Sequence, residues 1–274
     1  MRVIIALLLS LGCCAVYAQS EVVKINPEVM VYKEVDTISL KLFVYKPLDF
    51  DENKRYKTVV LFHGGGWNGG SPAMFRRQAV HFASRGMIAI TPEYRLKNKH
   101  GTTPFDCVTD AHDVMDFLKR KANKIGIDIE WIAVGGGSAG GHLATTTVFW
   151  NTRKPLTKAL LLFNPVLDTG PEGYGYRRME GRHQEISPMH NIMPSQPPTI
   201  ILIGTQDKIV PVKTVDGYKK KVEDKGGRCN VVFYEGEGHA FFAKKQKYFK
   251  ETLKEADNFL VSLGFLNEPV KIVK

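Results

Sequence analysis

Gly136-Gly137-Ser138-Ala139-Gly140 is the stretch that decides the fold of this chain. It has the Gly-x-Ser-x-Gly spacing in which a serine occupies a sharp turn between a strand and a helix. The apolar run at residues 131–134 predicts a buried strand before it, and residues 142–150 can form a helix after it. We therefore expect Ser138 to lie exposed on a strained turn, among glycines because side chains there would collide. By itself, the stretch is also compatible with an ordinary glycine-rich loop.

A second glycine-rich segment, His63-Gly64-Gly65-Gly66-Trp67, follows another short apolar run at residues 58–62. Backbone N–H groups in such a loop can point into a neighbouring pocket and hold the negative charge that develops on an ester oxygen attacked by a serine. Each preorganised donor contributes about 2.7–4 kcal/mol to such a transition state. We expect the donors of this oxyanion hole to be the amides of Gly65, Gly66 and Ala139, and His63 to be structural. A plain glycine turn is the alternative.

A serine hydroxyl is a weak nucleophile, so it needs a histidine as base and a carboxylate to orient that histidine. Among the eight histidines, His239 lies in a glycine-rich loop directly after an apolar run at residues 230–234. Asp207 follows the apolar run at residues 199–203, so both side chains are expected at the same edge of the sheet. Asp168 is the alternative acid, although it leads into a long irregular segment. We expect Ser138, Asp207 and His239 to form a catalytic triad.

The order of motif serine, acid and histidine, with an upstream His-Gly-Gly-Gly loop, resembles the α/β-hydrolase superfamily. Glu93-Tyr94-Arg95-Leu96 is similar to the Asp-Tyr-Arg-Leu stretch of many esterases and lipases of this fold, with Glu93 in place of the usual Asp. Residues 136–143, 163–170 and 204–211 resemble secreted bacterial esterases described as acetyl xylan esterase-like. The resemblance implies a serine esterase that hydrolyses short-acyl, above all acetyl, esters on plant or algal polysaccharides or their oligomers. It implies no metal and no organic cofactor.

Short apolar runs alternate along the chain with amphipathic segments of helix length, which predicts an α/β fold. The resemblance implies the same: a mostly parallel central sheet flanked by helices, with a short cap or loop insertion before the acid-bearing strand. With 274 residues, 43% of them hydrophobic, the chain can bury one large core. We expect an antiparallel pair at 29–36 and 37–45, then parallel strands at 58–62, 87–91, 131–134, 159–163, 199–203 and 230–234. Helices are expected at 73–85, 105–125, 142–150, 212–225 and 248–263.

The amino terminus predicts export. Met1 and Arg2 precede an apolar run at residues 3–11 that is short for a membrane span, and Val16-Tyr17-Ala18 offers a small-residue cleavage site. We expect a signal peptide at residues 1–18, a single catalytic domain at residues 19–274, and a secreted or periplasmic enzyme with no integral membrane segment after cleavage. A lipid anchor on Cys13 is the alternative, but the residues before it form an imperfect lipobox.

Two cysteines, Cys107 and Cys229, would remain after cleavage. An exported protein permits a disulfide, but in this fold the helix and the strand that carry them should lie far apart. We expect both to be free, buried thiols. Neither has partners at metal-ligand spacing.

The formal net charge of +10 raises the question of nucleic acid, but the lysines are scattered over expected helices, as solvated faces would be. The basic residues Arg177, Arg178 and Arg182 fall together in the irregular segment at residues 168–198. We expect this segment to form a cap over Ser138 and to contact an ester substrate, small or glycan-borne. The expected substrate-binding residues are Trp67, Tyr174, Tyr176 and Arg177, the aromatic ones by stacking on a sugar ring. A loop that covers the sheet edge is the alternative.

Two other functions remain compatible with the sequence. The first keeps the fold and changes the bond, because the His63 segment also resembles the His-Gly-Gly-x-Trp motif of arylformamidases, and peptidases use the same serine turn. The second is a catalytically inert binding module on the same fold. Such proteins usually lose members of the triad, whereas here all three positions have candidates. The sequence leaves the oligomeric state open.

Overall fold

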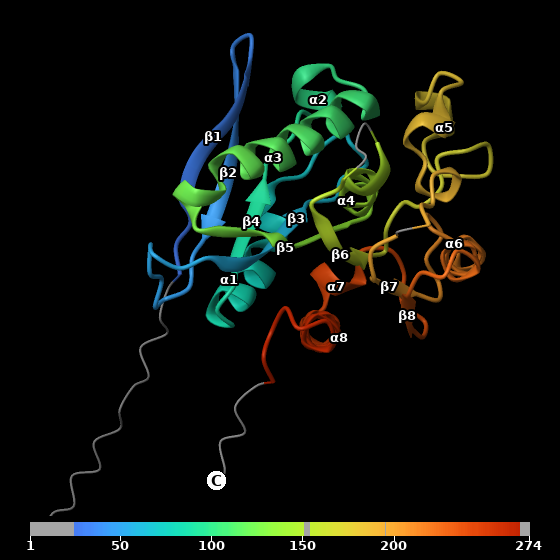
Figure 1. Ribbon diagram of the computed structural model, residues 1–274. Coiled ribbons are helices and arrows are strands. Elements are labelled where there is room, and N and C mark those ends of the chain that lie inside the picture. Colours follow the sequence, from blue (N-terminus) through green and yellow to red (C-terminus); the bar gives the residue numbers. More distant parts are fainter. Residues whose placement is uncertain (1–24, 151–153, 195, 269–274) are drawn as a thin grey trace, which may run out of the picture.

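The computed structural model describes residues 25–150, 154–194 and 196–268. These form one central sheet with helices packed on both of its faces (Figure 1). The expected signal peptide and Cys13 lie outside the described residues. No helix of the described part is long and apolar enough to cross a membrane.

The sheet has the order β1-β2-β4-β3-β5-β6-β7-β8. Its first two strands are antiparallel and join antiparallel to β4, and the other neighbours run parallel. The expected opening hairpin and mostly parallel sheet are therefore confirmed. The strands are β1 (Glu28–Val35), β2 (Ile38–Tyr45), β3 (Tyr56–Phe62), β4 (Ile88–Pro92), β5 (Ile127–Gly137), β6 (Thr157–Phe163), β7 (Thr199–Gly204) and β8 (Cys229–Tyr234).

The five longer helices lie close to the expected ranges: α1 (Arg76–Ser84), α3 (Pro104–Ile125), α4 (Ala139–Phe149), α6 (Val212–Asp224) and α8 (Gln246–Ser262). Local chemistry sets the ends of α3. Thr103 and Asp106 form a reciprocal capping box at its start, Pro104 occupies the first turn, and Gly126 ends it at a φ of 92°. Short helical turns occupy loops: η1 (Pro72–Phe75), α2 (Lys97–His100), η2 (Tyr176–Arg178), α5 (His183–Ile186), η3 (Pro188–His190) and α7 (Phe241–Lys244).

Two apolar cores lie on opposite faces of the sheet. Along β3, Val60 and Phe62 belong to the core under α3, α4 and α6, while Val59 and Leu61 belong to the core under α1 and α8. This division follows from the alternation of side chains along a strand, and it explains why the central strands read as continuous apolar runs.

Both Cys107 and Cys229 are free and buried, as expected. Burial raises the pKa of both thiols, that of Cys229 to about 12. A buried, protonated thiol is chemically inert.

The centre of the sheet contains a reversal of strand order. The chain moves from β3 outward to β4 and then returns across β3 to β5. In the register between β3 and β5, Phe62 lies opposite Gly136, so the loops that follow these two strands leave the sheet side by side. In open parallel sheets, such a crevice at the carboxyl ends of the strands is where ligands bind.

Candidate active site

Ser138 occupies the tight turn between β5 and α4, with a φ of 53°. This turn requires its glycines because a Cβ atom on Gly140 would lie 2.1 Å from the carbonyl oxygen of Phe62. The segment after β6 fixes the serine backbone from the other side. The amide of Ser138 donates to the carbonyl of Phe163 at 2.9 Å, and the amide of Val166 donates to the carbonyl of Ser138 at 3.1 Å. These backbone contacts therefore hold the candidate nucleophile in a fixed position.

The structure brings His239 and Asp207 together with Ser138. The Nε2 atom of His239 lies 2.8 Å from Oγ of Ser138, and Nδ1 of the same ring lies 2.7 Å from Oδ2 of Asp207. The carboxylate of Asp207 is fully buried, and its Oδ1 accepts the amides of Ile209 and Val210. Because a carboxylate can only accept, it places the imidazole proton on Nδ1 and leaves Nε2 free to accept the proton of the serine.

The alternative acid, Asp168, has a different role. Its Oδ1 accepts the amide of Gly170 at 2.7 Å and lies 3.4 Å from the hydroxyl of Ser187. Both partners belong to the segment at residues 168–198, so Asp168 shapes this segment.

The loop after β3 adopts backbone conformations that favour glycine. The φ angles are 121° at Gly65 and 61° at Gly66. The amide of Gly64 faces the sulfur of Met74 at 3.2 Å, whereas the amides of Gly65 and Gly66 have no acceptor among the described residues. The amide of Ala139, at the first position of α4, lies ahead of the helix's own hydrogen bonds. The loop and the helix start therefore offer free donors beside Ser138.

His63 supports this loop from below. Its Nδ1 lies 2.8 Å from the carbonyl of Gly64, its ring stacks on Tyr94 with 4.2 Å between centroids, and the hydroxyl of Tyr94 donates to its carbonyl. Burial lowers the pKa of His63 to about 4, so the ring is neutral at ordinary pH. These contacts agree with the expectation that His63 is structural.

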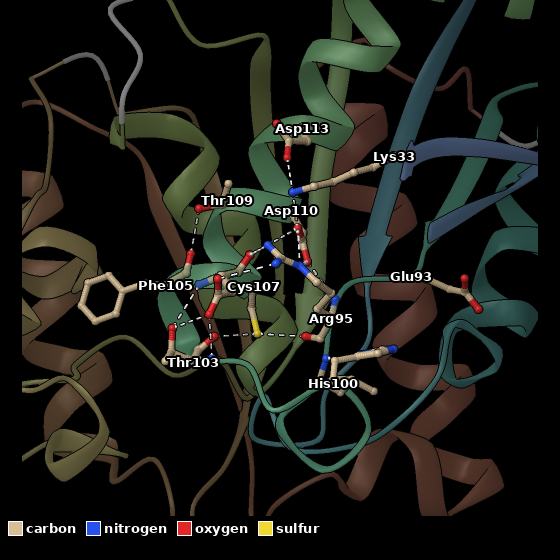
Figure 2. Close-up of polar contacts among 12 residues, drawn as sticks. Lys33, Glu93, Arg95, His100, Thr103, Phe105, Cys107, Thr109, Asp110 and Asp113 are labelled. Carbon is tan, nitrogen blue, oxygen red and sulfur yellow. Dashed lines mark hydrogen bonds and ion pairs between the residues drawn. The ribbon is translucent and has the colours of Figure 1, made fainter. Parts of the chain in front are cut away.

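A buried ion cluster anchors the neighbouring loop after β4 (Figure 2). The carboxylate of Asp110 on α3 is inaccessible to solvent and binds the guanidinium of Arg95 at 2.8 Å and the ammonium of Lys33 at 2.6 Å. Just beyond Arg95, the amides of Lys97 and Asn98 donate to the carbonyls of residues 67 and 68. The ion cluster therefore fixes the loop after β4, and hydrogen bonds from this loop fix the end of the glycine-rich segment.

A cavity of about 300 Å³ opens in front of Ser138. Its lining residues are Gly64, Gly65, Gly66, Met74, Gly137, Ser138, Asn164, Tyr174, Ile209, His239, Ala240 and Phe242. A larger hollow of about 650 Å³ lies near Thr157 and Pro197, at the amino ends of β6 and β7, and none of the triad candidates lines it. The cavity at the carboxyl ends of the strands is therefore the candidate site.

The structure places the four expected substrate-binding residues in different surroundings. Trp67 is fully buried, so its ring cannot stack on a sugar. Tyr176 packs edge-on against His183, and neither Tyr176 nor the exposed Arg177 lines the cavity. Of the four residues, only Tyr174 lines it. The motif places Trp67 beside the site, but its burial depends on the distant segment that covers it.

The expected basic cluster is also dispersed. Arg182 forms an ion pair with Glu185 and lies over the ring of Phe105, while the guanidinium of Arg178 turns inward to the carbonyl of Gly66. No joint basic surface of these arginines faces the cavity.

Sequence reasoning missed several residues that line the cavity. Asn164 lies directly after β6, with its amide nitrogen 3.3 Å from Nε2 of His239 and a positive φ of 38°. Its position at a strand end was the available signal. Met74, Ile209 and Phe242 supply apolar walls, and no motif marks them because apolar residues in loops carry no distinctive pattern.

Comparisons with known proteins agree with this geometry. A family model described as BD-FAE matches residues 42–166. A thermophilic esterase from the planctomycete Thermogutta terrifontis, solved with propionate bound, is 38% identical, with a TM-score of 0.84 and coverage of 89% of this chain and 97% of that one. Its butyrate-bound form is 37% identical, with the same TM-score and coverage of 89% and 96%.

An esterase from Gibberella moniliformis is 25% identical over 234 residues, which cover 74% of this chain and 71% of that protein. The sheet order and these similarities confirm the expected fold. Because almost the whole length of a solved esterase aligns with it at 38% identity, the chain belongs to the α/β-hydrolase family of esterases.

Proposed function

We propose that the protein is a serine esterase in which Ser138 is the nucleophile, His239 the general base and Asp207 the orienting acid. The observation that carries the proposal is the unbroken chain of contacts from Oγ of Ser138 through both ring nitrogens of His239 to Asp207, at 2.8 Å and 2.7 Å. Ser138 and His239 line a cavity that the glycine-rich loop also lines.

The reaction follows from these positions. Oγ of Ser138 attacks the ester carbonyl while Nε2 of His239 takes its proton, and the carbonyl oxygen becomes an oxyanion facing the amides of Gly65, Gly66 and Ala139. His239 then returns the proton to the departing alcohol. Water, deprotonated by the same nitrogen, attacks the acyl-enzyme, and the carboxylic acid leaves as Ser138 recovers its proton.

We propose short acyl groups, with acetyl as the principal one. Phe242 and Met74 border the cavity, and its volume of about 300 Å³ lies at the small end of ligand sites. The Thermogutta terrifontis esterase, which is 38% identical, was solved with propionate and with butyrate. Small acids of this kind fit a cavity of such size and apolar lining.

We further propose that the alcohol half belongs to plant or algal polysaccharides or their oligomers, and that residues 1–18 direct export. The support is the resemblance of three segments to acetyl xylan esterase-like enzymes and the charged, apolar and small-residue pattern at the amino terminus. Amino-terminal sequencing of the protein recovered from the medium or periplasm tests cleavage after Ala18.

Ser138→Ala tests the nucleophile. Without the hydroxyl no acyl-enzyme forms, so we expect kcat for p-nitrophenyl acetate to fall by about 10³-fold or more while the thermal unfolding midpoint is kept. A fluorophosphonate should label the wild type and not the variant. Full activity of the variant would refute the assignment.

The substrate proposal needs a separate comparison. Rates on p-nitrophenyl esters from acetate to octanoate should fall beyond butyrate, and acetic acid should be released from acetylated xylan. N-formylkynurenine separates the arylformamidase alternative, since preferential hydrolysis of this compound would replace the ester proposal.

A further inference from the structure

Trp67 has a backbone conformation that its side chain disfavours. Its φ of 60° lies in the left-handed region, where a bulky aromatic residue is a genuine outlier. It directly follows Gly65 and Gly66, which also have positive φ, and its carbonyl accepts the amide of Lys97. Strained backbone persists only where its surroundings enforce it. The contacts around Trp67 therefore determine the shape of the glycine-rich loop.

These contacts come largely from the segment at residues 168–198. The indole ring is fully buried, with its centroid 5.6 Å from that of Tyr174 and 5.1 Å from that of His142. A Cβ on Gly175 would lie 3.0 Å from the same indole. The guanidinium carbon of Arg178 lies 5.1 Å from the ring centroid, within the range of a cation–π contact. The segment thus closes over Trp67.

Arg178 also contacts the loop backbone itself. Its Nη1 donates to the carbonyl oxygen of Gly66 at 2.6 Å, the short distance typical of a charge-assisted hydrogen bond. Holding this carbonyl fixes the peptide plane that follows Gly66 and restricts a residue whose backbone is otherwise permissive. The amide of Gly66 lies on the other side of the same Cα, so its direction depends on this contact.

Among the described residues, no carboxylate forms an ion pair with the guanidinium of Arg178. Its Nη2 is buried and has no hydrogen-bond partner there. Partial burial of a cation that contacts only a carbonyl and an aromatic face costs desolvation free energy, so this arrangement is not explained by stability alone. Its position beside the loop suits a site where negative charge develops during the reaction.

We propose that Arg178 is a positioning residue that holds the amides of Gly65 and Gly66 in the geometry of the oxyanion hole. The proposal rests on Ser138 being the nucleophile. Through Arg178, the segment at residues 168–198 would affect catalysis by holding the glycine-rich loop in place. The effect belongs to the transition state, because the oxyanion exists only there and in the tetrahedral intermediates.

The test compares Arg178→Ala with Arg228→Ala, using p-nitrophenyl acetate. Arg228 is the control because its guanidinium also lies over an aromatic ring, that of Phe259 on α8 at 5.0 Å, and the residue directly precedes β8 and does not line the cavity. For Arg178→Ala we expect kcat to fall about 10- to 100-fold with KM within about threefold of wild type, since the donors are displaced and not removed. Arg228→Ala should keep kcat.

A trifluoromethyl ketone gives a readout that a purely structural role would not move. Oγ of Ser138 bonds to its carbonyl carbon, the serine proton passes to His239, and the ketone oxygen becomes an oxyanion. Its inhibition constant should rise in Arg178→Ala by the same factor as kcat/KM falls, while the affinity of the matching non-fluorinated ketone stays unchanged. Added guanidinium chloride at low millimolar concentration should restore part of kcat.

Arg178→Lys keeps the proposal testable if the alanine variant fails to fold. Lysine retains the charge but loses the planar fork, so a smaller loss of kcat is expected. Unchanged kcat in both variants, or a rise in KM alone, would overturn the proposal. Failure of the proposed function is distinguishable, because it would show as activity retained by Ser138→Ala whatever the result at Arg178.

Discussion

The two oxygens of Asp207 have different partners, and this difference sets the orientation and the proton position of His239. Oδ1 accepts two backbone amides, those of Ile209 and Val210, at 2.9 Å each, while Oδ2 faces Nδ1 of His239. The amides fix the plane of the carboxylate. The orientation of the imidazole therefore depends on the loop after β7 as much as on Asp207 itself.

Asp207→Asn should preserve this geometry and reverse the proton position on the histidine. The two amides require an acceptor, so the asparagine oxygen takes the place of Oδ1 and its NH₂ group faces Nδ1. That nitrogen must then accept, which places the proton on Nε2 and leaves Ser138 without a base. We expect kcat for p-nitrophenyl acetate to fall about 10³- to 10⁴-fold with little change in the urea midpoint. A kcat near that of wild type would contradict the proposed role of Asp207.

The sequence predicts the position of a residue well when the contacts that fix it come from residues nearby in the chain. Ser138 and the glycines around it were found because steric limits at a tight turn act within a few residues. The burial of Trp67 could not be found in this way. It depends on Tyr174 and Arg178, more than a hundred residues away, and no spacing rule connects them.

At the scale of elements, α3 is joined to β1 and to the loop after β4 by one buried carboxylate. Asp110 binds Lys33 on β1 and Arg95 in that loop, while Lys33 also contacts the more exposed Asp113 (Figure 2). Two carboxylates one turn apart thus share one lysine, but only Asp110 is fully shielded from solvent.

Asp110→Ala should therefore destabilise the protein far more than Asp113→Ala. Removing Asp110 leaves Arg95 and Lys33 without their buried counter-ion, and breaking such a pair costs about 3–5 kcal/mol. Removing Asp113 breaks a partly exposed pair worth about 0–1 kcal/mol. The free energies of unfolding from urea titrations of the two variants test this, and equal losses would show that the cluster is not a buried anchor.

Elements were predictable from sequence in proportion to their length. The strands and the long helices carry enough apolar residues to show their period, and the carboxyl end of α3 coincides with a glycine, Gly126. The four-residue helices α5 and α7 were missed because one turn shows no periodicity and is stabilised by its surroundings. β5 extends to Gly137, beyond the expected range, because β3 and β6 pair with its glycines on both sides.

At the scale of the whole molecule, one sheet both separates two cores and brings the site together. The reversal of strand order places the loops of β3 and β5 side by side, and the parallel strands β7 and β8 deliver Asp207 and His239 to the same edge. The same packing buries His63 beside the site and His142 in α4. Folding therefore removes two imidazoles from water, which makes the stability of the molecule depend on pH.

Burial lowers the pKa of both His63 and His142 from 6.5 to about 4. Well above pH 6.5 both are neutral in the folded and unfolded chains and contribute no pH dependence. Between 6.5 and about 4 the unfolded chain binds protons that the folded chain excludes, so stability falls with acidification, by about 1.4 kcal/mol per pH unit for each histidine. Over this range each histidine should remove about 3 kcal/mol, seen in urea unfolding at a series of pH values.

His142→Gln isolates the contribution of His142 to the pH dependence of stability. The carboxylates that titrate in the same range are the same in the wild type and in the variant. His142 lies in α4 with its Nε2 2.8 Å from the carbonyl of Ile186, which a glutamine amide can also reach as a donor. The variant should lose roughly half of the slope that His63 and His142 together contribute between pH 6.5 and about 4, whatever its stability at neutral pH. If wild type and variant lose stability with the same slope, His142 takes up its proton in the folded protein as readily as in the unfolded one. The core around α4 would then admit water.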